Sequence, residues 1–176
     1  ETREGILKHC SGNNAQRLGA VGERFLRGKS PSLEAQLANV ADEIAYNNHD
    51  VDDGLRSGYL NLPQLQEVAL WKEHFQAVQA LYPHAPERRM INETIRRIIN
   101  AQIADLTASV QQALAKLTPQ SVDDIRGSPE LVKFSTLMAE QNTQLKQFLR
   151  HNLYRHYQVR RMTNKAVRIV TDLFEA

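Results

Sequence analysis

One stretch, residues 41–54, concentrates side chains that can bind a ligand or move a proton. It reads Ala-Asp-Glu-Ile-Ala-Tyr-Asn-Asn-His-Asp-Val-Asp-Asp-Gly. Carboxylates, a phenol and an imidazole can each ligate a metal, donate a proton or hydrogen-bond a substrate. Asp42, Tyr46 and Asp50 follow one another at intervals of four residues. On a helix they would form one line, with roughly 6 Å between neighbours along the axis.

The preceding residues predict the helix that carries this line. Leu33, Leu37, Val40 and Ile44 recur with helical spacing and predict a buried face opposite the polar line. The polar line could simply be the solvated face of a surface helix, the usual location of charge. Against that, no Lys or Arg lies between Leu33 and Leu55, so the acids lack a basic partner on their own helix.

Several short segments of the sequence are similar to motifs of one enzyme family. Residues 31–36, 41–46 and 49–54, together with Leu153-Tyr154-Arg155-His156, resemble the deoxyguanosine triphosphate triphosphohydrolase (dGTPase) family of the HD-domain superfamily. These are metal-dependent hydrolases that release triphosphate from deoxynucleoside triphosphates. The resemblance covers the chain but only the C-terminal part of a full-length member. It implies that the intact protein converts dGTP to deoxyguanosine and triphosphate.

The resemblance also implies roles for individual residues. Asp42 matches the last Asp of the family's metal set, Tyr46 the Tyr that packs on the deoxyribose, and Asp50 the Asp that hydrogen-bonds the sugar 3′-hydroxyl. It implies a divalent metal, magnesium or manganese, a deoxynucleoside triphosphate as substrate, and a homo-oligomer. The catalytic residues are unknown, because the family's His and His-Asp helices are expected upstream of this chain.

His49-Asp50 spells the letters of the family's metal-binding pair, but the spacing argues against that role. His49 is seven residues from Asp42, roughly 10.5 Å along a helix. A metal–ligand bond is only about 2 Å long, so the two residues could not share one ion on an unbroken helix. His49 is therefore predicted not to be a ligand.

The C-terminal region is locally basic. Residues 141–171 hold seven Lys or Arg and no acid, with Tyr154 and Tyr157 among them. Such a segment can bind phosphates or single-stranded nucleic acid, or can be a solvated face. Its candidates for phosphate or nucleic-acid binding are Arg150, Tyr154, Arg155 and His156. A helical nucleic-acid-binding or purely structural module is therefore the alternative function.

Composition sets the broad class. The 176 residues are 41% hydrophobic and 24% charged, as in soluble globular proteins, and no apolar run is long enough to span a membrane. The single Cys10 fits a reducing, cytoplasmic location. The net charge of +2 creates no global attraction to polyanions.

No segment alternates with the period of a strand, whereas apolar residues recur with helical spacing. This predicts an all-α, irregular multi-helix bundle. It is expected to be one helical region: a helix end and flexible basic loop at 1–31, the motif helices at 32–82, and long helices with the basic segment at 86–176.

The expected elements have the following bounds. The motif helix runs from Ser30-Pro31 to His49, and Asp50 caps a short helix that Gly58 ends. Further helices are expected over 62–82, 86–117, 130–156 and 159–173, with a turn-rich link at 120–129. Since Asp42 is its only motif-based ligand, the chain alone is predicted to bind no divalent metal tightly and to hydrolyse no nucleotide.

Overall fold

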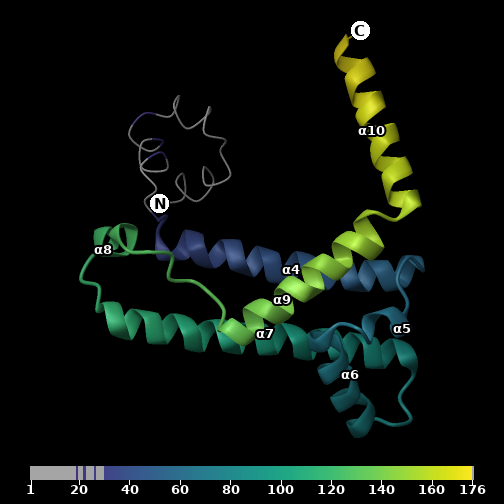
Figure 1. Ribbon diagram of the computed structural model, residues 1–176, viewed down its shortest axis with the longest axis horizontal. Helices are drawn as coiled ribbons and strands as arrows, with labels where there is room; N and C mark the ends of the chain where they lie inside the picture. Colours follow the sequence, from purple (N-terminus) through teal and green to yellow (C-terminus); the bar gives the residue numbers. More distant parts are fainter. Residues whose placement is uncertain (1–18, 20–21, 23–25, 27–29, 176) are drawn as a thin grey trace. The chain divides into compact units, whose positions relative to one another are not determined.

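The computed structural model describes Gly19, Gly22, Leu26 and residues 30–175. Within this part the chain is helical and contains no strand, which confirms the all-α prediction (Figure 1). The helix end expected before Ser11 and nearly all of the basic loop at 11–31 lie outside the described residues. The elements are α4 (Leu33–Ser57), α5 (Leu62–Leu65), α6 (Ala69–Leu81), α7 (Glu87–Leu117), α8 (Val122–Gly127), α9 (Thr136–Leu149), the π-helical turn η2 (Arg150–Tyr154) and α10 (Tyr157–Glu175).

The chain divides into two compact units. The first contains the part of α4 up to Ala45 together with Ala101–Met138, and the second contains Tyr46–Asn100 together with the residues from Ala139 onward. The Tyr46, Asp50 and Tyr154 side chains all belong to the second unit.

Helix α4 does not end at His49 as predicted but continues to Ser57. Val51 is 2% exposed and Gly54 is also buried, so the inward face of the helix continues past the acidic residues. Burial of that face outweighs the weak helix propensity of Asp and Gly. The short helix capped by Asp50 is therefore wrong.

Gly58 does end a helix, but the helix is α4. Its φ of +74° is a conformation that glycine adopts without a steric penalty. Its N–H donates to the Leu55 carbonyl at 3.3 Å, as is usual just beyond a helix C-terminus. The added turn also supplies Arg56, which pairs with Asp52 at 2.9 Å, and Arg88 of α7 pairs with the same carboxylate at 2.6 Å.

The buried face of α4 in the first unit differs from the predicted stripe. Leu37 is 49% exposed, whereas Gln36 is fully buried. The Gln36 amide donates to the Pro31 carbonyl at 2.9 Å and accepts from the backbone N–H groups of Leu131 and Val132 at 2.8 and 3.2 Å. Because every polar group of this buried amide is paired, Gln36 can occupy a core position.

The helix predicted over 62–82 is two helices, α5 and α6. A capping box formed by Asn61 and Gln64 starts α5. The N-terminus of α6 has no cap of its own, and Gln144 of α9 supplies one: its amide oxygen accepts from Ala69 N–H, and its amide nitrogen donates to the Glu67 carbonyl, both at 3.0 Å. A residue 75 positions away therefore fixes this helix start.

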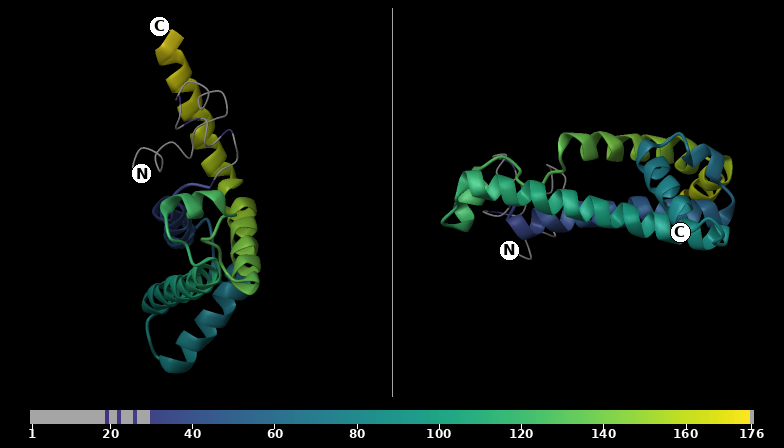
Figure 2. Two further views of the ribbon diagram at one scale, coloured as in Figure 1. Left: turned by 90° about the vertical axis from the view of Figure 1, so that its left-hand side faces the viewer. Right: turned by 90° about the horizontal axis from the view of Figure 1, so that it is seen from below.

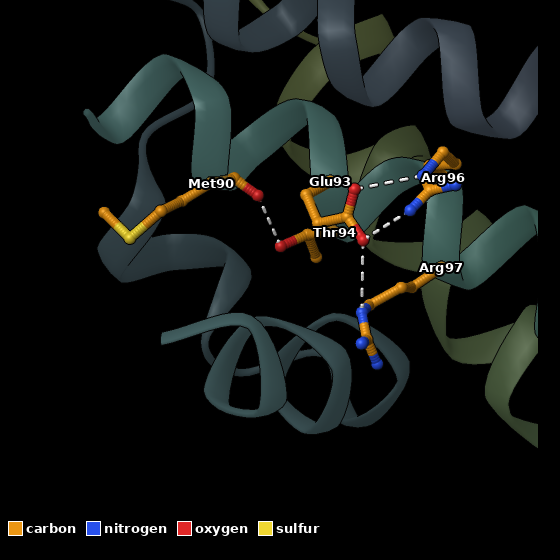
Figure 3. A network of polar contacts seen from close by, with 5 residues as sticks. All are labelled: Met90, Glu93, Thr94, Arg96 and Arg97. Atoms are coloured by element: carbon orange, nitrogen blue, oxygen red, sulfur yellow. Dashed lines mark hydrogen bonds and ion pairs between the residues drawn. The ribbon is translucent and has the colours of Figure 1, made fainter. Parts of the chain in front are cut away.

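Helix α7 matches its predicted range closely and ends at Leu117, and the next residue, Thr118, has a φ of +45°. Figure 3 shows Arg96 and Arg97 of α7 both directed at the Glu93 carboxylate, at 2.8 and 3.4 Å. Arg96, and secondarily Arg97, lower the pKa of Glu93. Thr94 donates to the Met90 carbonyl at 2.7 Å. These contacts lie within one helix, and exposed pairs of this kind contribute little to stability.

The helix predicted over 130–156 begins later and changes type. The Ser135 hydroxyl accepts from Met138 N–H at 3.3 Å and so caps α9, while Ser135 N–H donates to Asp105 at 2.9 Å. The link expected at 120–129 contains α8, started by a capping box of Ser121 and Asp124. The predicted last helix is confirmed as α10, the helix nearest the C-terminus (Figure 2). None of the residues of α10 is buried.

Candidate functional site

A hydrogen bond joins the two motifs singled out in the sequence. The Tyr154 hydroxyl donates to the Asp50 carboxylate, although the residues are 104 positions apart. Asp50 lies in α4 and is partly exposed, and Tyr154 ends the π-helical turn η2. The contact shows that the Asp50 motif and the Leu153–His156 motif meet in one place.

The π-helical turn and a glycine position Tyr154. A π-helical turn changes the register of the chain after α9, and such turns are rare and frequent at functional sites. Leu153 is 8% exposed and anchors the turn. A Cβ added at Gly54 would lie 3.4 Å from Leu153 Cδ1 and 2.5 Å from Leu60 Cδ1. Gly54 therefore allows Leu60 and Leu153 to pack against α4.

The environment of Tyr154 keeps its hydroxyl protonated. Burial first, and then the hydrogen bond to the Asp50 carboxylate, raise the pKa of Tyr154 well above its usual range. Tyr154 is thus a donor at neutral pH. The bond uses Asp50 Oδ2, and Oδ1 has no hydrogen-bond partner among residues 30–175.

A cavity of about 470 Å³ lies beside Tyr154. It is lined by Asn47, Lys146, Gln147, Arg150, Tyr154 and Arg155. Within the described chain neither Arg150 nor Arg155 has an ion-pair partner. Three cations around one cavity favour an anionic ligand such as a phosphate chain.

Asn47 is a feature of this cavity that the sequence analysis missed. Its side chain is 6% exposed, and its Nδ2 has no hydrogen-bond partner in the described part of the chain. A buried unpaired donor is costly, so a ligand acceptor in the cavity would satisfy it. Lys146 could have been found from the sequence, because Lys146, Arg150 and Tyr154 recur every four residues.

The other predicted site residues lie as follows. Tyr46 is 64% exposed and Asp42 is exposed, so both side chains are accessible to a ligand. Tyr46 does not line the cavity beside Tyr154, although its neighbour Asn47 does. His156 stacks on Tyr59 with ring centroids 4.5 Å apart, which makes it a packing residue of the second unit.

Comparison with known proteins agrees with the family resemblance of the sequence motifs. A family profile described as a phosphohydrolase-associated domain matches residues 132–176, which contain α9, η2 and α10. A deoxyguanosinetriphosphate triphosphohydrolase-like protein of Ralstonia nicotianae is 61% identical over 174 residues, covering 99% of this chain and 45% of that protein. One from Bordetella pertussis is 58% identical over 176 residues, covering 100% and 46%.

The chain is a relative of the deoxyguanosinetriphosphate triphosphohydrolase-like proteins. This confirms the resemblance drawn from residues 31–54 and 153–156. The chain spans slightly under half the length of these triphosphohydrolase-like relatives. No helix within its described residues is long and apolar enough to cross a membrane.

The triphosphohydrolase resemblance implies a divalent metal, which would need several protein ligands. No group of three or more His, Cys, Asp or Glu side chains that could hold a metal ion occurs among the residues placed by the structure. Asp42 offers one exposed carboxylate. The described residues therefore do not amount to a complete metal site.

Proposed function

We propose that this chain is the C-terminal part of a metal-dependent deoxynucleoside triphosphate triphosphohydrolase, whose intact form converts dGTP to deoxyguanosine and triphosphate. The hydrogen bond from Tyr154 to Asp50 is the observation that carries the proposal. It puts the proposed sugar-binding acid next to a cationic cavity of suitable charge for a triphosphate. The names of the relatives support the same reaction class.

In this proposal Asp50 recognises the sugar. Tyr154 holds Oδ2, and Oδ1 accepts a hydrogen bond from the 3′-hydroxyl. The exposed ring of Tyr46 packs on the deoxyribose. A ring in contact with the sugar leaves no space for a 2′-hydroxyl, and this clash selects deoxynucleotides over ribonucleotides.

The triphosphate lies against the cations of the cavity. Arg150 and Arg155 present guanidinium groups that match phosphate geometry, and Lys146 adds a point charge. The Asn47 amide donates to a ligand oxygen. His156, stacked on Tyr59, supports the turn without contacting the ligand.

Asp42 is proposed as one ligand of a magnesium or manganese ion in the intact protein. When bound, such an ion neutralises phosphate charge and activates water. The remaining ligands are expected from residues outside the described part of this chain.

The test uses the intact protein and two substrates, dGTP and its 2′,3′-dideoxy analogue. If Asp50 binds the 3′-hydroxyl, the native enzyme prefers dGTP in kcat/KM, and Asp50→Asn reduces that preference about tenfold, because it removes a charged hydrogen bond. Asp53→Asn is the matched control, an exposed acid on the same helix. An unchanged preference in Asp50→Asn would contradict the assignment of the sugar site.

One observation favours a second candidate, a single-stranded nucleic-acid site on the basic segment. Arg155, Arg160 and Arg161 are exposed beside Tyr154 and Tyr157, which are 46% and 67% exposed. Cations with exposed aromatic rings bind single strands through phosphates and stacked bases. Oligonucleotide binding that weakens steeply with salt would favour this function. Loss of that binding when dGTP is added would place it at the cavity instead.

A further inference from the structure

Helix α10 presents a broad apolar face that is exposed from Met162 onward. Its apolar residues occupy an arc of about 160° when drawn at 100° per residue, interrupted only by Thr163. Met162, Val170 and Leu173 are 63%, 52% and 72% exposed. The full set on this face is Val159, Met162, Ala166, Val167, Ile169, Val170, Leu173 and Phe174. A helix with this pattern normally buries such a face.

Five of these residues follow the spacing of a coiled coil. The intervals between them are three, four, three and four residues, which keeps one seam turned toward a partner helix. They are Val159, Met162, Ala166, Ile169 and Leu173. Helix α10 has 19 residues and is about 28 Å long, and the seam from Val159 to Leu173 spans about 21 Å of it.

Two charged residues flank the seam. Lys165 and Asp172 lie one heptad apart, each directly before a seam residue, whereas Arg160, Arg161, Arg168 and Glu175 lie further from the seam. In a parallel pair these two charges would lie opposite uncharged positions, Thr163 or Val170, and would find no partner. In an antiparallel pair Lys165 of one helix lies opposite Asp172 of the other.

We propose that the apolar face of α10 binds α10 of a second copy of this chain in an antiparallel pair. In the register that matches the charges, Ala166 faces Ile169 of the second copy, and Met162 faces Leu173. Lys165 and Asp172 then form two symmetric ion pairs across the seam. Neither of these two charges has an ion-pair partner in the described chain.

Cysteine cross-linking in the full protein tests both the surface and the polarity. In a Cys10→Ser background, Ala166→Cys and Ile169→Cys are made singly, with different tags, and co-expressed. Mild oxidation is expected to give a disulfide between the two different variants and little between identical ones. Asn164→Cys, on the opposite face of α10, is the control and gives none. Disulfides between identical copies of Ala166→Cys would mean a parallel pair and overturn the proposal. The absence of any cross-link would mean that another part of the protein covers the face, which also overturns it.

A charge exchange tests the register independently. Lys165→Asp is expected to weaken self-association at least threefold in sedimentation equilibrium, because two acids then face each other. Adding Asp172→Lys to it restores association, because the opposite charges meet again with their positions exchanged. If the double variant is as weak as the single one, Lys165 and Asp172 do not face each other and the proposed register is wrong.

Discussion

Tyr154 and Asp50 depend on each other for their hydrogen bonding. Tyr154 donates its hydroxyl to a partly exposed carboxylate, whose other oxygen has no hydrogen-bond partner among residues 30–175. Loss of the phenol would leave Asp50 to be oriented by water, whereas loss of the carboxylate would leave the phenol without an acceptor. The contribution of the pair to stability and its proposed role in sugar binding can therefore be measured separately.

Tyr154→Phe is expected to lower the free energy of unfolding of the chain by about 1 kcal/mol, because a hydrogen bond to a charged but partly exposed acceptor is lost. Urea denaturation at neutral pH measures it. Tyr157→Phe is the control: its hydroxyl accepts from Gln158 Nε2 at 2.6 Å on an exposed surface, and its removal should cost less than about 0.5 kcal/mol. If the losses of unfolding free energy caused by Asp50→Asn and Tyr154→Phe were fully additive in the double variant, the hydrogen bond would contribute nothing to stability.

The raised pKa of Tyr154 predicts a specific pH dependence. The folded chain holds this proton above pH 10, near which an unfolded tyrosine loses it, so the stabilisation is complete below about pH 10 and is lost as the pH rises through the folded-state pKa. The phenolate absorbance of the native chain minus that of Tyr154→Phe should therefore rise only above about pH 10. A difference curve centred at or below that pH would show that Asp50 and burial do not retain the proton.

At the scale of elements, the close packing of Leu60 and Leu153 against α4 limits which side chain can occupy position 54. Gly54→Ala should destabilise the chain by about 1–2 kcal/mol, although alanine is the better helix former. The new methyl group would lie 2.5 Å from Leu60 Cδ1, and Leu60 is 3% exposed and cannot move aside freely. Thermal or urea unfolding measures the change.

Gly127→Ala is the matched control for that substitution. Gly127 also lies in a helix, and a Cβ there would meet nothing within 4 Å. The unfolding free energy of the Gly127→Ala variant should stay the same as that of the native chain or increase slightly. Equal destabilisation by the two substitutions would rule out the contact with Leu60 as the cause.

In the first unit the Gln36 amide links α4 to the segment before α9. Gln36→Leu should cost about 2–4 kcal/mol of unfolding free energy, because it leaves the Pro31 carbonyl and the N–H groups of Leu131 and Val132 unpaired. Gln112→Leu, at an exposed position of α7, should change stability by less than about 0.5 kcal/mol. A small effect at Gln36 would mean that water replaces the amide.

At the scale of the whole molecule, the small number of possible metal ligands among the described residues predicts that the chain is inactive by itself. Calorimetric titration with manganese should detect no tight binding, and a triphosphate-release assay on dGTP should detect no turnover. A hydrolytic metal site needs about three protein ligands, and the described residues contain no such group. Micromolar metal affinity, or turnover abolished by Asp42→Ala, would show that the site is complete within this chain.

Features that depend on neighbouring residues were predictable from the sequence. The helical period predicted α7 and α10 closely, and the flanking prolines bounded α7, because side-chain periodicity and proline geometry act over a few residues. The motifs around Asp42–Asp50 and Leu153–His156 predicted the relationship to the triphosphohydrolase-like proteins, because a motif is recognised from the order of its residues alone.

The tertiary structure decided everything that depends on distant residues. Helix α4 continues past His49 because Val51 is buried, and α6 begins where Gln144 supplies a cap. The contact between Tyr154 and Asp50 closes a loop of 104 residues. Burial and hydrogen bonds of this kind arise only when separate segments pack together, so local patterns of the sequence do not contain them.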